Sequence, residues 1–227
     1  MRRDWVSEGL GVLSEFRRDA LSRQQSEDFG MATGHNAIVT PITGGFIATP
    51  TMTAEEFFTY SCAGRRLELV AGEIREMSPS GFDHGELVLH LGALLIDFAS
   101  RHGTVRVAGG DVGFVVARDP DTVLAPDIAV VRSERIPESG CSRFVDGAPD
   151  LAVEIVSPSD RPSEIEAKAR HWIGCGARLV WVVHRAKTTV TIYRGGGERT
   201  ALSLDDTLDG GDVLPGFTCP VRRVFKM

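Results

Sequence analysis

The strongest constraint on the fold of this 227-residue chain is the run LAVEIV at residues 151–156, in which one glutamate interrupts five apolar residues. A short and nearly continuous apolar run is typical of a strand that is buried on both faces of its sheet. A sheet of that kind needs other layers of secondary structure packed against it. We therefore expect residues 151–156 to form an inner strand of a layered fold.

The surrounding pattern supplies helices and further strands for those layers. Asp83 is expected to cap a long helix that Gly103 ends. The apolar residues of this helix have the spacing of one helix face, and they are Leu87, Leu91, Leu94, Leu95 and Phe98. A second helix is predicted over residues 163–173, and strands are predicted at residues 105–107, 113–117, 128–131, 179–183 and 189–194. This order predicts an α/β fold with a mixed central sheet flanked by helices.

The first 50 residues differ from the rest of the chain. Apart from a short helix expected near residues 12–21, they show little apolar periodicity, and the run TPITGG at residues 40–45 is typical of a loop. We expect residues 1–50 to be a poorly ordered N-terminal extension and residues 51–227 to form the domain. That domain is expected to begin with a capping box from Thr53 to Glu56, followed by a hairpin over residues 67–77.

Composition excludes several classes of protein. The net charge is −6, from 25 Lys+Arg against 31 Asp+Glu, so the chain is not a basic protein that coats nucleic acid. No stretch approaches 18 uninterrupted apolar residues, and no apolar segment follows the first basic residues, so we expect neither a membrane span nor a secretory signal and expect a cytoplasmic protein. The cysteines lack the spacing of a zinc site or a disulfide framework, and they are Cys62, Cys141, Cys175 and Cys219.

Two acidic residues stand at positions where a carboxylate is costly. Glu154 interrupts the buried-strand run, and Asp127 follows Pro126 at the start of another apolar strand. A buried carboxylate must be paired, protonated or bound to a metal ion. The alternative for each is structural: Asp127 as a turn residue at a strand end, and Glu154 as the partner of a nearby arginine.

Lys168 is the third candidate. It shares a helix face with Ile165 and Trp172, so its side chain is expected to point toward the sheet. The alternative is an ordinary surface ion pair with Glu164, four residues earlier. Together, two strand carboxylates and an inward lysine suit metal-dependent phosphodiester hydrolysis, because Mg²⁺ binds one or two carboxylates with water and substrate phosphate.

Several separated blocks of residues also carry a family resemblance. The blocks are ELVAGE at 68–73, His84, Pro126-Asp127, VEIVSPS at 153–159, Lys168 with Trp172, Gly176 and Trp181, and LPGF at 214–217. In order and spacing they resemble the Uma2 family of bacterial endonucleases, which belongs to the PD-(D/E)XK nuclease superfamily. The resemblance covers about residues 52–225 and implies a restriction-endonuclease-like fold.

The resemblance also implies roles for individual residues. Asp127 would be the aspartate of the PD motif and Glu154 the acid of the next strand, and these two would hold Mg²⁺ or Mn²⁺ with the carbonyl of Ile155. The superfamily lysine normally follows that acid by two residues, where this chain has Val156, and the resemblance places it at Lys168. The family's early acid and histidine correspond to Glu73 and His84, although a satisfied structural histidine is the favoured role for His84 apart from the resemblance. The chain departs from the family pattern by Trp172 in place of a tyrosine, Ala71 in place of an aspartate, and RL in place of Pro-Glu at residues 178–179.

The sequence therefore predicts a metal-dependent endonuclease that hydrolyses DNA phosphodiester bonds. The alternative is a catalytically inactive module of the same fold that binds nucleic acid or protein, because a fold does not fix a function and the net charge is negative. No membrane partner is expected, and a homodimer is left open. The sequence names neither the target sequence nor its strandedness.

Overall fold

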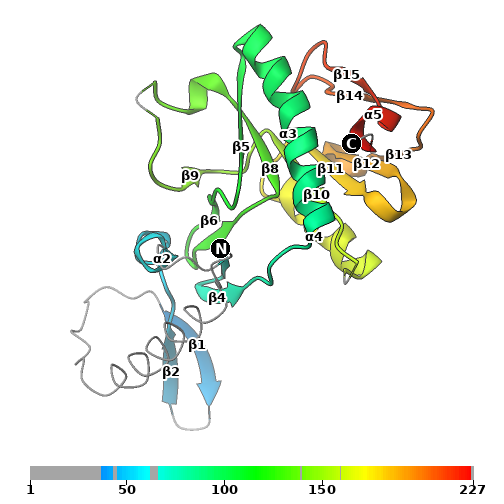
Figure 1. Ribbon diagram of the computed structural model, residues 1–227. Coiled ribbons are helices and arrows are strands. Elements are labelled where there is room, and N and C mark those ends of the chain that lie inside the picture. The colour runs from blue at the N-terminus through cyan, green and yellow to red at the C-terminus, as the bar shows by residue number, and fades with distance from the viewer. Residues whose placement is uncertain (1–36, 43–44, 62–65, 139, 159, 226–227) are drawn as a thin grey trace, which may run out of the picture. The chain divides into compact units, whose positions relative to one another are not determined.

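The computed structural model describes residues 37–42, 45–61, 66–138, 140–158 and 160–225, with the side chains of residues 51–60, 66–138, 140–158 and 160–225 (Figure 1). The helix expected near residues 12–21 lies outside the described residues. The expectation that residues 1–50 form a poorly ordered extension therefore stays a prediction.

A six-stranded mixed sheet forms the centre of the domain. Its strand order is β13 (Arg199–Leu202), β12 (Thr189–Arg194), β11 (Leu179–His184), β10 (Leu151–Ile155), β8 (Ile128–Arg132) and β5 (Val105–Gly109). The β10–β11 pair is parallel and every other pair in this sheet is antiparallel. All five residues of β10 are buried, which confirms the inner strand predicted from its apolar run.

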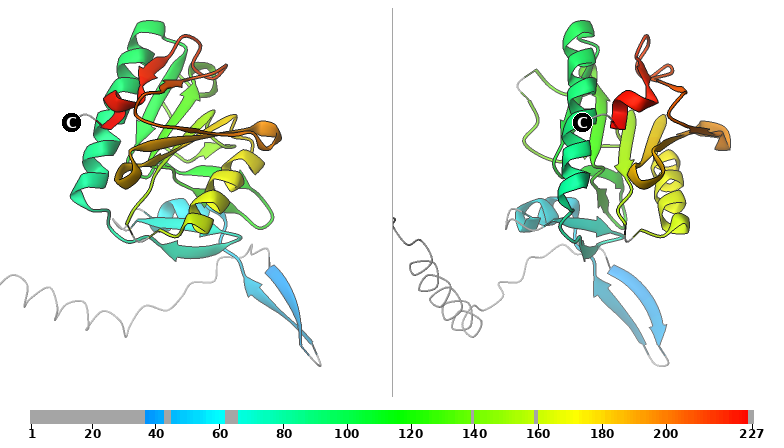
Figure 2. Two further views of the ribbon diagram at one scale, coloured as in Figure 1. Left: turned by 90° about the vertical axis from the view of Figure 1, so that its right-hand side faces the viewer. Right: turned by 45° about the vertical axis from the view of Figure 1, so that its right-hand side comes forward.

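Helices cover both faces of this sheet. The long helix α3 (Phe82–His102) lies on one face and α4 (Pro162–Gly174) on the other, as the right-hand view of Figure 2 shows. Leu87, Leu91, Leu95 and Phe98 of α3 share one buried cluster with the inward side chains of the central strands. Ala169 and Trp172 of α4 share a second cluster with the side chains of the opposite face. The α/β class and the flanking helices are confirmed.

A second sheet stands beside the first. Its order is β4 (Glu73–Glu76), β3 (Leu67–Val70), β7 (Thr122–Leu124), β6 (Phe114–Ala117) and β9 (Val145–Asp146). The predicted β3–β4 hairpin is present, and it turns through Ala71 and Gly72, whose φ angles are 52° and 77°. Such left-handed values at both central positions match the right-handed twist of the flanking strands.

The remaining elements are short. The helix α2 (Ala54–Ser61) begins with the predicted capping box, in which Glu56 accepts the Thr53 backbone N–H and Thr53 Oγ1 accepts the Glu56 N–H. Near the end of the chain, β14 (Thr207–Asp209) pairs with β15 (Thr218–Pro220), and α5 (Val221–Phe225) follows. No helix in the described ranges is long and apolar enough to cross a membrane.

Two local predictions were wrong. The N-cap of α3 is Gly81, without a side-chain cap, so Asp83 lies inside the first turn, where its charge still favours the positive end of the helix dipole. The run at residues 40–45 is not wholly a loop, because β1 (Ala37–Ile42) pairs with β2 (Gly45–Pro50). Proline and glycine in that run indicated a turn but not the hairpin strands that flank it.

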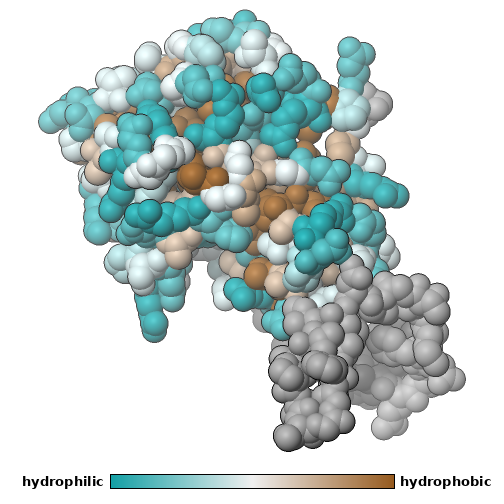
Figure 3. Space-filling model, turned by 180° about the vertical axis from the view of Figure 1, so that it is seen from behind, coloured by the Kyte–Doolittle hydropathy of each residue, from teal (hydrophilic) through white to brown (hydrophobic). Residues whose placement is uncertain are grey.

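Large apolar side chains are mostly inside. In the view from behind, the surface is largely hydrophilic and its hydrophobic residues lie in small areas (Figure 3). The large hydrophobic side chains that are exposed are Tyr60, Ile74, Met77, Phe82, Leu89, Ile96 and Leu204. Three of these seven belong to α3.

Candidate active site

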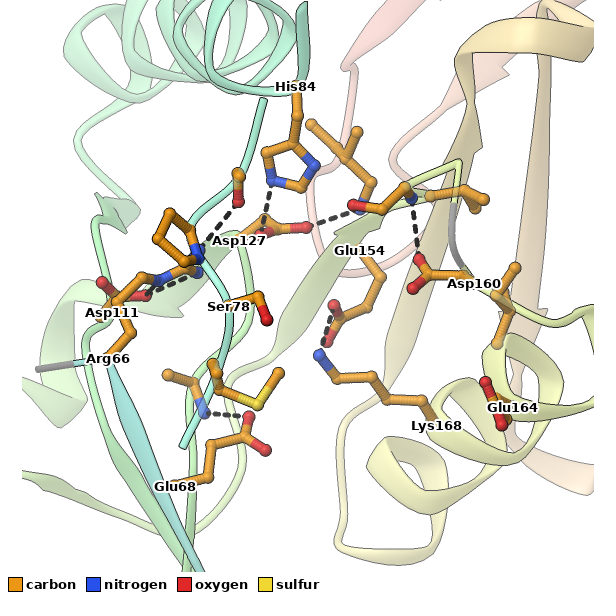
Figure 4. Close-up of a pocket in the computed structure, with 18 of the residues that line it drawn as sticks. Arg66, Glu68, Ser78, His84, Asp111, Asp127, Glu154, Asp160, Glu164 and Lys168 are labelled. Carbon is orange, nitrogen blue, oxygen red and sulfur yellow. Dashed lines mark hydrogen bonds and ion pairs between the residues drawn. The ribbon is translucent and has the colours of Figure 1, made fainter. Parts of the chain in front are cut away.

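A pocket of about 430 Å³ lies where the ends of β8 and β10 meet β3, the start of α3 and α4 (Figure 4). Four of the five predicted catalytic residues line it: His84, Asp127, Glu154 and Lys168. Ile155, the expected source of a carbonyl ligand, also lines it. Residues separated by more than 80 positions in the chain are thus brought to one cavity.

Strand register explains how the two central carboxylates come together. The β8–β10 ladder pairs Ile128 with Val153, and continuing the same register places Asp127 opposite Glu154. Residues directly opposite each other in an antiparallel pair project on the same face. Both carboxylates therefore reach the same pocket, as Figure 4 shows.

Asp127 is held as a carboxylate by two donors. His84 Nε2 lies 3.0 Å from its Oδ1, and the backbone N–H of Ile155 donates to its Oδ2 at 2.7 Å. Burial alone would raise the pKa of Asp127, but these hydrogen bonds outweigh it and the net pKa is lowered. The same contact raises the pKa of His84. Both side chains are only 12% exposed, so this pair is more than a surface ion pair.

Glu154 is the most deeply placed acid of the pocket. Its Oε1 accepts the indole N–H of Trp172 at 2.6 Å, and its Oε2 lies 2.9 Å from Nζ of Lys168. Burial, opposed in part by Lys168 and reinforced by Asp127, raises the pKa of Glu154 to about 7. The ionic partner of Glu154 in the structure is Lys168. The alternative prediction of an arginine partner is therefore wrong.

Lys168 points into the pocket rather than along the surface of α4. Its ion pair is with Glu154 and not with Glu164, which was the surface alternative. Burial alone would lower the pKa of Lys168, but the negative charges of Glu154, Glu68 and Asp127 raise it above its ordinary value. The ammonium therefore remains charged at neutral pH while these carboxylates are ionised.

The pocket as a whole is strongly acidic. Seven carboxylate residues line it against two permanent cations, Arg66 and Lys168. Arg66 is already engaged, because it pairs with Asp111 at 2.8 Å and donates to Ser80 at 2.8 Å. The seven acids are Glu68, Glu76, Asp111, Asp127, Glu154, Asp160 and Glu164. Coulomb repulsion from these carboxylates opposes the approach of a phosphate group, and an added cation would offset it.

Glu73 is the one predicted site residue that the structure does not bring to the pocket. It is exposed on β4 and is absent from the lining. Glu68, on the paired strand β3, lines the pocket instead, and its Oε1 accepts the backbone N–H of Ala125 at 3.4 Å. The β3–β4 register pairs Glu68 with Arg75 and Val70 with Glu73, so Glu68 and Glu73 lie on the same face of the hairpin, and Glu73 lies at its turn end.

The pocket offers carboxylate oxygens, which are the kind of ligand that a divalent ion such as Mg²⁺ binds. No group of three or more His, Cys, Asp or Glu residues placed to hold a metal ion occurs among the described residues. Mg²⁺ does not require one, because it usually keeps several waters and takes one or two carboxylates together with substrate phosphate. Asp127 and Glu154 supply two hard oxygen donors, so the residues fit such an ion.

Comparisons with known proteins identify the fold and the family of the chain. A crystal structure described as "a putative nuclease belonging to DUF820", from Anabaena variabilis, matches with a TM-score of 0.65 and 20% sequence identity. The match covers 77% of this chain and 97% of that chain, and it shows the restriction-endonuclease-like fold. No curated protein matches. The model of one protein family matches residues 54–222, which contain the whole pocket, and its description is "Putative restriction endonuclease". The chain belongs to this family, Uma2.

Proposed function

We propose that this protein is a divalent-metal-dependent endonuclease that hydrolyses phosphodiester bonds of DNA. The observation that carries the proposal is the placement of Lys168, whose ammonium lies 2.9 Å from Glu154 in the pocket that Asp127 also lines. Two acids and a lysine in one pocket are groups that suit metal-dependent phosphodiester hydrolysis. Membership of a family described in endonuclease terms supports the same assignment.

Asp127 and Glu154 would hold the ion, with the carbonyl of Ile155 as a third donor. When bound, Mg²⁺ or Mn²⁺ supplies positive charge that polarises the phosphoryl group and lowers the pKa of water. The acidic lining favours dependence on a metal ion, because seven carboxylate residues line the pocket against two permanent cations. A module built only to bind nucleic acid would gain nothing from acids at this position.

The protein's own residues would orient the reacting groups. His84 and the Ile155 N–H fix both oxygens of Asp127, and Trp172 fixes one oxygen of Glu154. Lys168 would donate hydrogen bonds to the attacking water and stabilise the negative charge that develops on the phosphoryl oxygens. Because its pKa is raised in the metal-free protein, Lys168 there is an ammonium donor and not a base. The attacking water would lose one proton to solvent as its bond to phosphorus forms, and the bond from phosphorus to the leaving oxygen would break, with that oxygen taking up a proton from solvent.

A cleavage assay tests the proposal. Supercoiled plasmid, short duplex DNA, single-stranded DNA and RNA would be incubated with the protein in Mg²⁺, Mn²⁺, Ca²⁺ or EDTA. We expect DNA cleavage in Mg²⁺ or Mn²⁺, none in EDTA, and none from Asp127→Asn. Asp97→Asn is the matched control, because Asp97 pairs with Arg101 on the exposed face of α3. Binding of DNA without cleavage in any metal would favour the non-catalytic module, and cleavage of RNA alone would contradict the assignment to DNA.

A further inference from the structure

Both oxygens of the Glu154 carboxylate are occupied by donors in the metal-free protein. Oε1 accepts the Trp172 indole N–H at 2.6 Å, and Oε2 lies 2.9 Å from Nζ of Lys168. Mg²⁺ binds a carboxylate oxygen at about 2.1 Å, so an ion on Oε2 would lie no more than about 5 Å from an ammonium that stayed there. Two cations at that separation repel each other in a pocket partly shielded from water. An incoming ion would therefore repel Lys168 but not the neutral indole.

Of these two donors, Lys168 is also the one that can move. Trp172 is fully buried in the cluster between α4 and the sheet. The Lys168 side chain is 34% exposed, and it carries its charge on a flexible four-carbon stem. The ammonium can therefore leave Oε2 by side-chain rotation while Trp172 and the backbone of α4 stay in place. It then needs a new acceptor inside the pocket, because an ammonium that withdrew into water could not stabilise charge at the reacting centre.

Glu68 is the acid of the pocket best placed to receive this ammonium. In Figure 4 the side chains of Glu68 and Lys168 project into the pocket from opposite walls, which β3 and α4 form. Burial lowers the pKa of Lys168, whereas the charge of Glu154 and then that of Glu68 raise it. Asp127 acts on Lys168 more weakly and is itself a ligand of the proposed ion. Glu68 is therefore the nearest influence on the lysine that the ion does not need.

The carboxylate of Glu68 is only weakly held by the rest of the chain. Among the described residues it accepts one hydrogen bond, from the Ala125 backbone N–H at 3.4 Å, which is longer than the usual range for such bonds. The β3–β4 register places Arg75 opposite Glu68, but the two form no ion pair in the part of the chain that the structure describes. Oxygen atoms of Glu68 are therefore available to an ammonium that approaches from the other wall.

We propose that Glu68 is a positioning residue that accepts the Lys168 ammonium when Glu154 binds the divalent ion. Two carboxylates then serve one lysine in turn, Glu154 in the metal-free protein and Glu68 in the metal-bound protein. The exchange frees Oε2 of Glu154 and keeps the ammonium in the pocket. This inference rests on the metal site of the proposed function, and it assigns to Glu68 a contact with the lysine and not with the ion.

Calorimetric titration of Mn²⁺ at pH 8 in two backgrounds tests the proposal. In the wild-type background, Glu68→Gln should weaken ion binding by about tenfold, as expected for coupled neighbouring charges, because Lys168 then stays on Glu154. In the Lys168→Ala background the same change should have little effect, since no ammonium needs an acceptor. Glu76→Gln is the matched control, because Glu76 lines the same pocket from the neighbouring strand β4. It should have a smaller effect, equal in both backgrounds.

The outcomes separate this inference from the proposed function. Thermal melts show that each variant folds, and Glu68→Asp, which keeps the charge, should retain most of the wild-type affinity. Equal weakening by Glu68→Gln in both backgrounds would overturn the proposal, because Glu68 would then be a ligand of the ion. Wild-type affinity in Glu68→Gln would overturn it as well, with the proposed metal site left intact. A wild type that binds no ion would contradict the metal site itself, and this inference with it.

Discussion

The ammonium of Lys168, on α4, lies 2.9 Å from Oε2 of Glu154, on β10. The other oxygen of Glu154 accepts the Trp172 indole N–H at 2.6 Å, from the next turn of the same helix. One helix thus holds both oxygens of a carboxylate that a neighbouring strand delivers into the pocket. Lys168 thereby reaches Glu154 from the helix, although the two residues are 14 positions apart in the chain.

Replacement of Lys168 should separate chemistry from metal binding. Lys168→Ala should reduce DNA cleavage by about two orders of magnitude or more, because a positioned charge on the developing anion is lost. The change in melting temperature that Mn²⁺ causes should persist in Lys168→Ala, since Asp127 and Glu154 remain. Lys168→Arg should also be impaired, because a planar guanidinium does not replace a compact ammonium. Arg170→Ala is the control, since Arg170 pairs with Glu166 outside the pocket. Cleavage by Lys168→Ala at the wild-type rate would refute this role for the lysine.

Trp172 should act as a positioning residue for Glu154. Trp172→Phe removes the indole donor and should cost about 2 kcal/mol of unfolding free energy, a typical value for a hydrogen bond to a charged group, plus the loss from a smaller side chain in the core. The indole N–H lowers the pKa of Glu154, so the variant should need a higher pH for half-maximal metal binding. Trp181→Phe is the matched core control, because the Trp181 N–H has no partner in the described structure. An unchanged pH profile in Trp172→Phe would leave Trp172 with a packing role alone.

Metal binding should weaken on acidification through neutral pH. The pKa of Glu154 is raised to about 7 in the metal-free protein, so below that pH the ion must displace a proton from this carboxyl. The apparent affinity should fall by about tenfold per pH unit below the pKa and level off above it, as expected for displacement of one proton. Mn²⁺ titrations between pH 5.5 and 8.5 measure this. An affinity that is flat across that range would show that Glu154 is not the ligand that titrates.

His84 should stabilise the metal-free fold on the acidic side of neutrality. Its pKa is raised above 6.5 by Asp127, so the folded state binds this proton more tightly than the unfolded state does. The stabilisation by His84 is complete below the pKa that His84 has in the unfolded chain. It is lost as the pH rises through the pKa of His84 in the folded protein. The loss of stability in His84→Gln should therefore be larger at pH 5.5 than at pH 8.5. His90→Gln is the control, because His90 contacts the carbonyl of Arg223 and no carboxylate. An equal loss at both values would contradict the pairing with Asp127.

Much of the fold follows from local patterns in the sequence. The apolar spacing after Asp83 predicts α3, and the run at residues 151–156 predicts an inner strand. Both patterns are visible because burial of apolar side chains is the dominant favourable contribution to folding. The short strands β7, β14 and β15 were missed. They contain three residues each and depend on partners that are distant in the chain, so no local period distinguishes them.

The site could be predicted only in part. Asp127, Glu154 and Lys168 are polar residues in apolar surroundings, and that conflict is visible in the sequence. The family resemblance pointed to Glu73, whereas the structure places Glu68 in the pocket. The two glutamates lie on the same face of the β3–β4 hairpin, so strand alternation does not distinguish them, and their position along the hairpin relative to the pocket required the structure. The pair of His84 with Asp127 spans 43 residues and required the structure.

The central claim is that Asp127 and Glu154 share one divalent ion. Calorimetric titration of Mn²⁺ into the wild type, Asp127→Asn, Glu154→Gln and the double variant, at pH 8, tests it most directly. One ion should bind per wild-type chain, and each single change should weaken binding by at least about tenfold, as expected when a hard oxygen ligand is lost. The double variant should lose less than the sum of the two single losses, because the first change already disrupts the shared site. Wild-type affinity in both single variants would contradict the account.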